Sequence, residues 1–437
     1  MYKNFIIEQQ PCRADNGAFD GGRDGVGALR QAPDMAGNGH SGADGAAQPR
    51  TQANREDGPP PRAAAPLRIR SVEPIALEAP LPRAVATPIT AIRTVVALLV
   101  AVRDDDGVEG WGEVWCNFPR FGFHHRARLL TEVFAPALRE RSFASPAEAW
   151  AHLTSISNVL RLQSGESGPI AAVIAGLDIA LHDIAAKKAG LPLWRMLGGA
   201  SGRVPVYASL ARSDDVRPAV ERALARGLRA VKLRSSGSIA DHLAVVRPIR
   251  ALAGASCAIM LDVNSSWNAD AALATIGQLA EARLAWLEEP IPVDAPADVW
   301  RRLADAAPMP LAGGENMVTP QMFDRALAEP ALAVLQPDIT KWGGFSGGVP
   351  LARRIAAAGR RYCPHTFAGA PGVIASAHLL AASGSADGML EFGVNHNPVR
   401  DGLLGCAPED GMLDLGDAPG LGFDVDRRAL ERFTVPV

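Results

Sequence analysis

The chain has 437 residues, 48% of them hydrophobic, and a formal net charge of −3. This length suits two domains, and the apolar content is sufficient for a large core. The near-neutral charge gives no bulk attraction to nucleic acid or to an anionic membrane. The five cysteines are scattered without zinc or redox spacing, which indicates a reducing compartment.

Two features of the sequence bear on where the protein works. The opening stretch, MYKNFIIEQQPC, has no apolar segment of the kind found in signal peptides. No uninterrupted apolar run is long enough to cross a bilayer. We therefore expect a cytoplasmic protein with no membrane and no nucleic-acid partner.

Residues 1–66 differ in composition from the rest of the chain. They are rich in Gly, Ala and Pro, show no hydrophobic periodicity and end in NREDGPPPRAAAP. Such a segment cannot bury enough apolar surface to order itself, so we expect a disordered extension. A misassigned start codon, with Met35 as one alternative start, would also explain this composition.

Residues 67–200 predict an α+β domain. The strand-like runs LRIRSVEPIALEAPL, TVVALLVAV and VEGWGEVW, with the turn signal DDDG before the third, predict an antiparallel meander. Helical patterns follow at about 125–140, 146–160 and 170–188. The Gly/Pro/Asp-rich tail, residues 397–437, is expected to pack back on this domain and complete it.

Residues 201–396 change to a regular alternation of short apolar runs and helical patterns. The eight strand candidates are VPVYASL, AVKLR, AIMLDVN, LAWLEEP, PLAGGEN, AVLQPDI, RYCPHT and GMLEFG. Eight strands that alternate with helices favour an α/β barrel of the TIM type over an open doubly wound sheet. No glycine-rich phosphate fingerprint follows the first strand, which argues against a nucleotide-binding fold.

Three consecutive strand candidates of this barrel end in an acid, namely Asp262, Glu288 and Glu315. They recur every 26 or 27 residues, and a strand with its crossover helix and loops takes about 25–30 residues. The carboxyl ends of parallel barrel strands meet on one face, where catalytic residues lie. Three converging carboxylates would repel one another without a cation, and Mg²⁺ or Mn²⁺ suits an all-oxygen site.

Ionisable residues also end the other barrel strands. Lys232 and Arg234 share one face of the second strand because side chains alternate. Asp338, His365 and Glu391 end the sixth, seventh and eighth strands. Each of these alone is most often a helix cap, a solvated charge or a structural residue. Because these residues recur at similar intervals and always at the ends of predicted strands, they are not expected to be independent surface charges.

Seven motifs together identify a family that the chain resembles. They are GLDIALHDIAAKKAGLPLWRMLGG, VKLR, LDVN, LEEP, GGEN, PDITKWGG and PHTFAGAPG. Over residues 67–437 the chain resembles the enolase superfamily, and within it the mandelate racemase branch, the mandelate racemase/muconate lactonizing enzyme family. The resemblance implies an N-terminal α+β capping domain over a (β/α)7β-type barrel, and assembly as a homo-oligomer.

The resemblance also implies a chemistry and a metal. The family removes the proton α to a carboxylate, and a divalent cation stabilises the charge of the resulting enediolate. By this resemblance Asp262, Glu288 and Glu315 are the Mg²⁺ ligands, with Mn²⁺ as a possible substitute. The substrate is then a small carboxylic acid.

Three further positions match catalytic residues of the family. His365 with Asp338 resembles the family's His–Asp dyad, and the reference pKa of histidine, about 6.5, suits a base near neutral pH. Asp338 would fix the tautomer of the ring. Glu391 resembles the electrophilic carboxylic acid, which needs a raised pKa to donate a hydrogen bond.

One position departs from the family pattern. Lys232 resembles the first lysine of the family's Lys-x-Lys motif, but Arg234 stands where the family has its second lysine, the second base. Arginine is effectively always protonated and suits anion binding better than proton abstraction. Either Lys232 takes over as the second base, or the enzyme needs only one.

Four polar residues are candidates for substrate binding. Asn264 follows Asp262 by two positions, and Lys341 follows the sixth strand after a short loop. Asn117 and Arg120 lie in one of two capping-domain loops, residues 81–93 and 116–125, that we expect to set specificity. Each of the four is as readily an ordinary loop or surface residue.

These observations favour a dehydratase that eliminates water from a hydroxy acid or sugar acid through an enediolate. The first alternative is racemisation or epimerisation of an α-substituted acid. The second is a catalytically silent barrel that binds a metal–carboxylate ligand as a sensor. The presence of His365, Asp338 and Glu391 argues against the silent barrel.

Deleting residues 1–66 is expected to leave the thermal midpoint and kcat nearly unchanged, because a segment of this composition buries little apolar surface. Thermal melts and steady-state kinetics of the full-length and truncated proteins check this expectation. A large loss in either quantity would mean that the extension docks on one of the two domains.

Overall fold

The structure, a computed structural model, describes residues 66–86, 91–210, 216–367, 369–423 and 425–437. Residues 1–65 lie outside the described residues, so the disorder expected for the extension stays a prediction.

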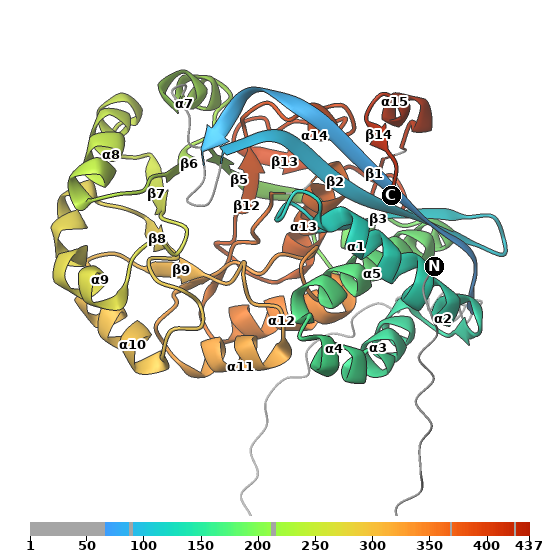
Figure 1. Cartoon of the computed structure of the whole chain (residues 1–437). Helices are drawn as coiled ribbons and strands as arrows, with labels where there is room; N and C mark the ends of the chain where they lie inside the picture. Colours follow the sequence, from blue (N-terminus) through green and yellow to red (C-terminus); the bar gives the residue numbers. More distant parts are fainter. Residues whose placement is uncertain (1–65, 87–90, 211–215, 368, 424) are drawn as a thin grey trace, which may run out of the picture. The chain divides into compact units, whose positions relative to one another are not determined.

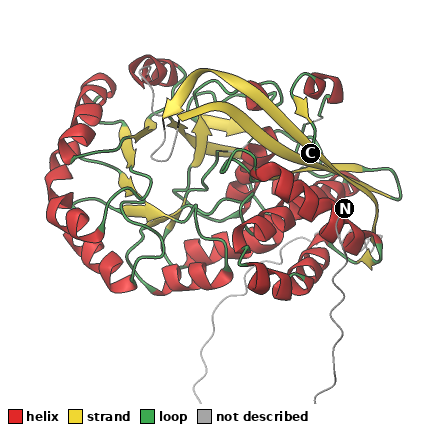
Figure 2. Ribbon diagram, viewed as in Figure 1, coloured by secondary structure: helices red, strands yellow, loops and turns green. Residues whose placement is uncertain are grey.

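An antiparallel sheet and a group of helices form the N-terminal capping domain (Figures 1 and 2). The sheet order is β14-β1-β2-β3, and β4 pairs with β1. Its first four strands are β1 (Leu67–Ala86), β2 (Ala91–Asp104), β3 (Glu109–Val114) and β4 (Ser142–Phe143). The helices are α1 (Gly122–Arg128), η1 (Leu129–Phe134), α2 (Ala135–Arg139), α3 (Pro146–Ile156), α4 (Asn158–Ser164), α5 (Ser167–Ala189) and α6 (Leu193–Met196).

Two glycines of β3 allow helix α5 to lie directly against the strand. A Cβ atom on Gly112 would lie 2.0 Å from the carbonyl oxygen of Gly176, and one on Gly110 would lie 2.2 Å from that of Ala180. Only glycine permits so close an approach of strand and helix backbones. The direction in which β3 leaves the sheet is therefore fixed by α5.

Helix α5 is long and apolar enough, by length and composition, to cross a membrane, but 83% of its most apolar window is buried inside the protein. Two buried acids on this helix bind neighbouring backbone. Asp178 accepts a hydrogen bond from Phe345 N at 2.7 Å, and Asp183 accepts from Trp111 N at 2.9 Å and Leu421 N at 2.8 Å. The helix is a core element that joins the capping sheet, the barrel and the tail.

Eight parallel strands curl around a common centre in the order β11-β10-β9-β8-β7-β6-β5-β12, with helices outside them (Figure 2). Each predicted barrel strand contains one of them: β5 (Arg203–Ser209), β6 (Ala230–Arg234), β7 (Ala258–Asp262), β8 (Trp286–Glu288), β9 (Leu311–Gly313), β10 (Val334–Leu335), β11 (Arg361–Tyr362) and β12 (Leu390–Gly393). The helices are α7 (Val216–Ala225), α8 (Ile239–Ala253), α9 (Ala269–Thr275), η2 (Ile276–Ala282), α10 (Ala297–Ala306), α11 (Pro320–Ala328), α12 (Gly344–Ala357) and α13 (Ala370–Ala382). The predicted fold class, a TIM-type α/β barrel with an N-terminal α+β capping domain, is confirmed.

The C-terminal tail contacts both domains. It contains α14 (Pro398–Asp401), β13 (Met412–Asp414), α15 (Arg427–Glu431) and β14 (Thr434–Val435). Strand β14 pairs with β1 of the capping domain, as expected for the tail, but β13 pairs antiparallel with the first residues of β5 in the barrel. Those residues precede Val206, where pairing of β5 with β12 begins, so their backbone groups are free to accept β13.

Candidate active site

The interior of the barrel has an apolar layer and, two residues further along the chain from each member of that layer, a polar layer at the carboxyl ends of the strands. The apolar layer consists of Tyr207, Ala230, Met260, Trp286, Ala312, Val334 and Cys363, with Met389 packed against it. The polar layer consists of Ser209, Lys232, Asp262, Glu288, Gln336, His365 and Glu391, and Gly314 occupies the equivalent position after β9. Because side chains alternate along a strand, both layers face the barrel interior, and the polar layer lies nearer the carboxyl ends.

Lys232 is the central cation of the polar layer and is completely buried. Its Nζ atom lies 2.5 Å from Glu288 Oε1, 2.8 Å from Glu391 Oε1 and 3.9 Å from Asp262 Oδ2. Burial lowers the pKa of Lys232, but these three carboxylates outweigh burial and raise the pKa above its ordinary value. With these carboxylates as its partners, Lys232 favours its charged form, which argues against its use as the second base.

Arg234 lies beside Lys232 as a second fixed cation. Its Nε atom lies 3.0 Å from Asp262 Oδ2, and one terminal nitrogen lies 3.4 Å from Glu391 Oε1. Burial lowers the pKa of Arg234, but Asp262 and Glu391 outweigh burial and raise the pKa above its ordinary value. Its side chain is 14% exposed, so it can meet an incoming anion, whereas Lys232 cannot.

Glu391 is an ionised carboxylate in this structure. It accepts hydrogen bonds from Ser209 Oγ at 2.6 Å and Thr366 N at 3.3 Å. Burial raises the pKa of Glu391, but Lys232, His365 and Arg234 outweigh burial and lower it to about 2. In the absence of a divalent cation, the pKa of Glu391 is thus lowered and not raised as expected for an electrophilic acid, because cations from other strands contact this carboxylate.

Glu288 is held by three donors from inside the barrel. Besides Lys232, it accepts hydrogen bonds from Gln336 Nε2 at 2.7 Å and Trp286 Nε1 at 3.2 Å. Burial raises the pKa of Glu288 to about 7, and the neighbouring carboxylates of Asp262, Glu391 and Glu315 add to the rise although Lys232 opposes it. The negative charge of the neighbouring carboxylates is thus not fully offset by Lys232.

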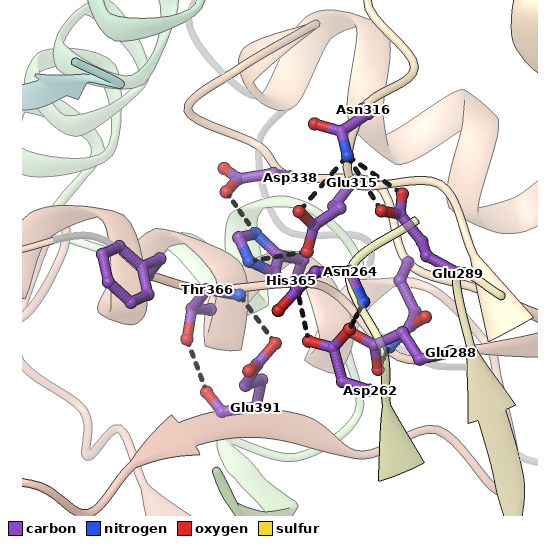
Figure 3. Close-up of polar contacts among 12 residues, drawn as sticks. Asp262, Asn264, Glu288, Glu289, Glu315, Asn316, Asp338, His365, Thr366 and Glu391 are labelled. Atoms are coloured by element: carbon purple, nitrogen blue, oxygen red, sulfur yellow. Dashed lines mark hydrogen bonds and ion pairs between the residues drawn. The ribbon is translucent and has the colours of Figure 1, made fainter. Parts of the chain in front are cut away.

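Asp262 is oriented by Asn264, which follows it in a turn with a positive φ of 46°. The backbone N–H of Asn264 donates to Asp262 Oδ1 at 2.8 Å, and its side-chain amide donates to Oδ2 at 3.1 Å (Figure 3). Asn264, predicted as a substrate contact, is placed by the structure as a support for this carboxylate.

His365 lies between two carboxylates (Figure 3). Its Nδ1 atom is 2.8 Å from Asp338 Oδ2, and its Nε2 atom is 3.0 Å from Glu315 Oε2. Thr340 donates to the other oxygen of Asp338 through its N–H at 2.8 Å and its hydroxyl at 2.6 Å. The structure therefore brings the predicted dyad together and leaves Nε2 as the nitrogen directed towards the carboxylate cluster.

Neighbouring charged groups determine the protonation of His365 and Glu315. Burial lowers the pKa of His365, but Glu315, Glu391 and Asp338 outweigh burial and raise it to about 10. Burial raises the pKa of Glu315, but His365 and Lys341 together lower it well below its ordinary value. His365 and Glu315 thus form an ion pair at neutral pH in this structure.

Glu289 is a member of the carboxylate cluster to which the sequence pattern assigned no role. Both of its oxygens accept from Asn316 Nδ2 at 3.0 Å, and one accepts from Ser265 Oγ at 3.1 Å. Burial, followed by Glu315, raises its pKa to about 8. The doublet Glu288-Glu289 was the available signal, but the doublet alone does not say which member faces the barrel interior.

The other predicted substrate contacts have protein partners. Lys341 Nζ donates to Asn316 Oδ1 at 3.1 Å, and Asn117 Nδ2 donates to Phe367 O at 3.4 Å. Arg120 pairs with Glu78, and its side chain is 62% exposed. The structure places Lys341 beside the carboxylate cluster, brings Asn117 to the loop after His365, and gives Arg120 a partner in the capping domain.

The capping hairpin and the barrel enclose a cavity of about 70 Å³ beside the polar layer. Its hairpin side is apolar and consists of Leu81, Val85, Ile92 and Val95, and its barrel side includes Ser209, Arg234, Thr366 and Phe367. The predicted specificity loop 81–93 thus contributes to the lining, and none of the described lining residues comes from the loop 116–125.

Comparison with known families matches both domains. Residues 70–198 match the mandelate racemase/muconate lactonizing enzyme N-terminal domain, and residues 215–429 match the enolase C-terminal domain-like family. A crystal structure of a mandelate racemase/muconate lactonizing enzyme from Bordetella bronchiseptica RB50 is 45% identical, with a TM-score of 0.78, and the match covers 84% of this chain and 99% of that one.

The chain belongs to the mandelate racemase/muconate lactonizing enzyme family of the enolase superfamily.

Two enzymes and one further solved structure are also similar to this chain. D-galactarolactone cycloisomerase from Agrobacterium fabrum is 29% identical over 78% of this chain and 91% of its own length. Arabinonate dehydratase from Saccharolobus solfataricus is 28% identical over 62% of this chain and 74% of its own length. An enolase from Bradyrhizobium, solved with magnesium and mandelic acid, is 26% identical with a TM-score of 0.75 and covers 85% of this chain and 99% of that one.

In this family member, His365 is expected to keep its proton well above neutral pH when divalent cations are removed. Its pKa is raised from 6.5 to about 10, so the stability it gains from Glu315 and Asp338 is fully present below about pH 6.5 and is lost as pH rises through about 10. NMR of the imidazole nitrogens in chelator-treated protein measures this titration.

His378 supplies an internal control for that titration. Burial lowers the pKa of His378 to about 4, so its ring should stay neutral over the same range. A pKa near 6.5 for His365 in chelator-treated protein would contradict the ion pair with Glu315.

Proposed function

We propose that this protein is a Mg²⁺-dependent lyase that removes water from a sugar acid or another hydroxy acid. The observation that carries this proposal is that one His–Asp dyad stands opposite cations that cannot accept a proton. His365, held by Asp338, is the candidate base, whereas Lys232 and Arg234 are paired with carboxylates. One base is sufficient for elimination, but a racemase needs a competent group on each face of the substrate.

The carboxylate cluster fits a divalent cation in its chemistry. All the predicted ligand atoms, those of Asp262, Glu288 and Glu315, are carboxylate oxygens, which are the donors that Mg²⁺ prefers. Their mutual repulsion contributes to the raised pKa of Glu288, and an added cation would relieve it. Among the described residues, no group of three or more His, Cys, Asp or Glu side chains is arranged so that it could hold a metal ion. Lys232 instead contacts Glu288, and His365 contacts Glu315.

We assign Asp262, Glu288 and Glu315 as the residues that hold Mg²⁺, with Mn²⁺ as a possible substitute. When bound, the cation supplies a Lewis acid for the enediolate charge and a positive charge that replaces the proton of His365 beside Glu315. The solved relative with magnesium and mandelic acid supports this choice of metal and of a carboxylate ligand.

The residues of the chain then divide the reaction between them. Arg234, at the wall of the cavity, binds the substrate carboxylate. His365 Nε2 takes the α-proton, and Asp338 holds the proton on Nδ1 so that Nε2 carries the free electron pair. The electrons of the broken C–H bond form the enediolate, the β C–O bond breaks, and the departing hydroxide takes the proton that His365 Nε2 had received and leaves as water.

Two other functions remain alternatives from the sequence. Racemisation or epimerisation would need a second base that exchanges protons, whereas Arg234 carries a guanidinium that stays protonated and Lys232 is paired with Glu288 and Glu391. A silent metal–carboxylate sensor would not need the contact between His365 and Asp338. The similarity to arabinonate dehydratase supports elimination.

We propose further that the working protein is cytoplasmic and homo-oligomeric, with a small carboxylate as its ligand and neither nucleic acid nor membrane as a partner. Its near-neutral net charge and the burial of helix α5 support these proposals. We propose domain limits of 67–200 for the capping domain, completed by 397–437, and 201–396 for the barrel.

Replacing the base and the fixed cation should have different kinetic effects. His365→Asn is expected to lower kcat by about 10²–10⁴-fold, the usual contribution of a general base. Arg234→Lys is expected mainly to raise KM, because a lysine keeps the charge but loses the planar fork that binds a carboxylate. A screen of hydroxy and sugar acids that begins with arabinonate identifies the acid for these measurements.

Proton NMR in D₂O with each enantiomer of that acid tests the single-base assignment. We expect α-deuterium incorporation from one enantiomer and its loss in His365→Asn. Comparable incorporation into both enantiomers, surviving in His365→Asn for one of them, would show a second working base and favour racemisation.

A further inference from the structure

The end of β3 crosses from the capping domain to the two barrel loops that carry the His–Asp dyad. Three alternate residues of this segment, Glu113, Trp115 and Asn117, each contact one of those loops. The direction of the segment is fixed upstream by the close packing of β3 on α5. None of the three has a role in the proton transfer described above.

Glu113 makes the firmest of these contacts. It is 2% exposed, and its two oxygens accept hydrogen bonds from Gly369 N at 2.5 Å and Gly372 N at 2.9 Å. These N–H groups belong to the loop after His365 and to the first turn of α13, where backbone donors have no partner within the helix. A charged acceptor at this position also interacts favourably with the helix dipole.

The loop is fitted closely to this carboxylate. A Cβ atom on Gly369 would lie 3.1 Å from Glu113 Oε2, which is tighter than most real contacts of a Cβ atom. The preceding stretch of the same loop contains His365 and Thr366. Because β11 ends at Tyr362, these residues lie beyond the strand that would otherwise hold them.

The other half of the dyad is held by the same segment. Trp115 N donates to Thr340 O at 3.4 Å, and Lys341 Nζ lies 4.5 Å from the centre of the Trp115 ring. Thr340 in turn binds Asp338 through its N–H and its hydroxyl. The segment from Glu113 to Asn117 thus contacts the loop of Asp338 as well as the loop of His365.

We propose that Glu113 is a positioning residue, which holds the loop of His365 at the distance from Asp338 that proton abstraction requires. This inference rests on the proposed function only in taking His365 as the base. It makes the capping domain part of the catalytic geometry, in addition to its contribution to the cavity wall. A displacement of about 1 Å at the reacting nitrogen is enough to cost roughly 10²-fold in rate.

The buried position of Glu113 makes ionisation of its carboxyl group less favourable. Burial raises its pKa to about 7, the two glycine N–H groups oppose that rise, and Asp338 adds to it. Replacing this carboxyl with a neutral amide of the same shape removes the cost of burying a charge. We therefore expect Glu113→Gln to remain folded, with its effect concentrated on the loop.

Hydrogen-exchange mass spectrometry of the full chain tests the contact without any substrate. In Glu113→Gln, one acceptor oxygen becomes an amide that cannot accept from Gly369 or Gly372, so exchange in residues 364–373 should accelerate by about tenfold or more. Glu148→Gln is the matched control, because Glu148 accepts from Ala144 N at 2.7 Å elsewhere in the capping domain. The control should change exchange near residue 144 and leave residues 364–373 unaltered.

Kinetics separate positioning from a purely structural role. With the acid turned over by the wild type, Glu113→Gln should lower kcat by about tenfold to a hundredfold with little change in KM. Glu113→Asp, which keeps both oxygens, should recover part of kcat. A wild-type kcat in Glu113→Gln, or unaltered exchange in residues 364–373, would overturn the proposal, whereas failure of the proposed function would show in His365→Asn instead.

Discussion

Lys232 contacts Glu288 and Glu391 at the centre of the barrel, where all three side chains are fully buried or nearly so. Removing such charges from water costs several kcal/mol for each ion, and only close pairing offsets that cost. The arrangement of the polar layer follows from this constraint. Lys232 contacts Glu288 and Glu391, Arg234 contacts Asp262, and His365 and Lys341 pair with Glu315.

The same charges explain why the two sides of the site behave differently. On one side, contacts with carboxylates favour the charged forms of Lys232 and Arg234 and raise the pKa of both residues. On the other side, His365 contacts two carboxylates, and its proton affinity depends on the charge beside Glu315. A site with one adjustable base and two fixed cations is suited to elimination. The capping domain contributes the apolar cavity wall and the contacts that hold the dyad loops.

Much of this arrangement could be predicted from the sequence because parallel strands repeat every 26 or 27 residues and side chains alternate along them. That phase alone predicts that Lys232, Asp262 and Glu288 share one layer. Gln336 has the same phase but was missed because it carries no charge. The ionisation of Glu391 was predicted wrongly because it depends on a 2.8 Å contact with Lys232 from another strand, and strand order alone gives no distances. Glu113 was missed because its partners, Gly369 and Gly372, lie in the other domain and are indistinguishable from other loop glycines in a sequence.

We propose that catalysis requires a divalent cation held by the carboxylates of Asp262, Glu288 and Glu315. Activity measured after chelator treatment, and again after addition of Mg²⁺, tests this claim most directly. We predict that the stripped enzyme is inactive, that Mg²⁺ restores it, and that Glu315→Gln stays folded but neither binds the cation by calorimetry nor turns over substrate. Full activity in the chelator-stripped enzyme would contradict the claim.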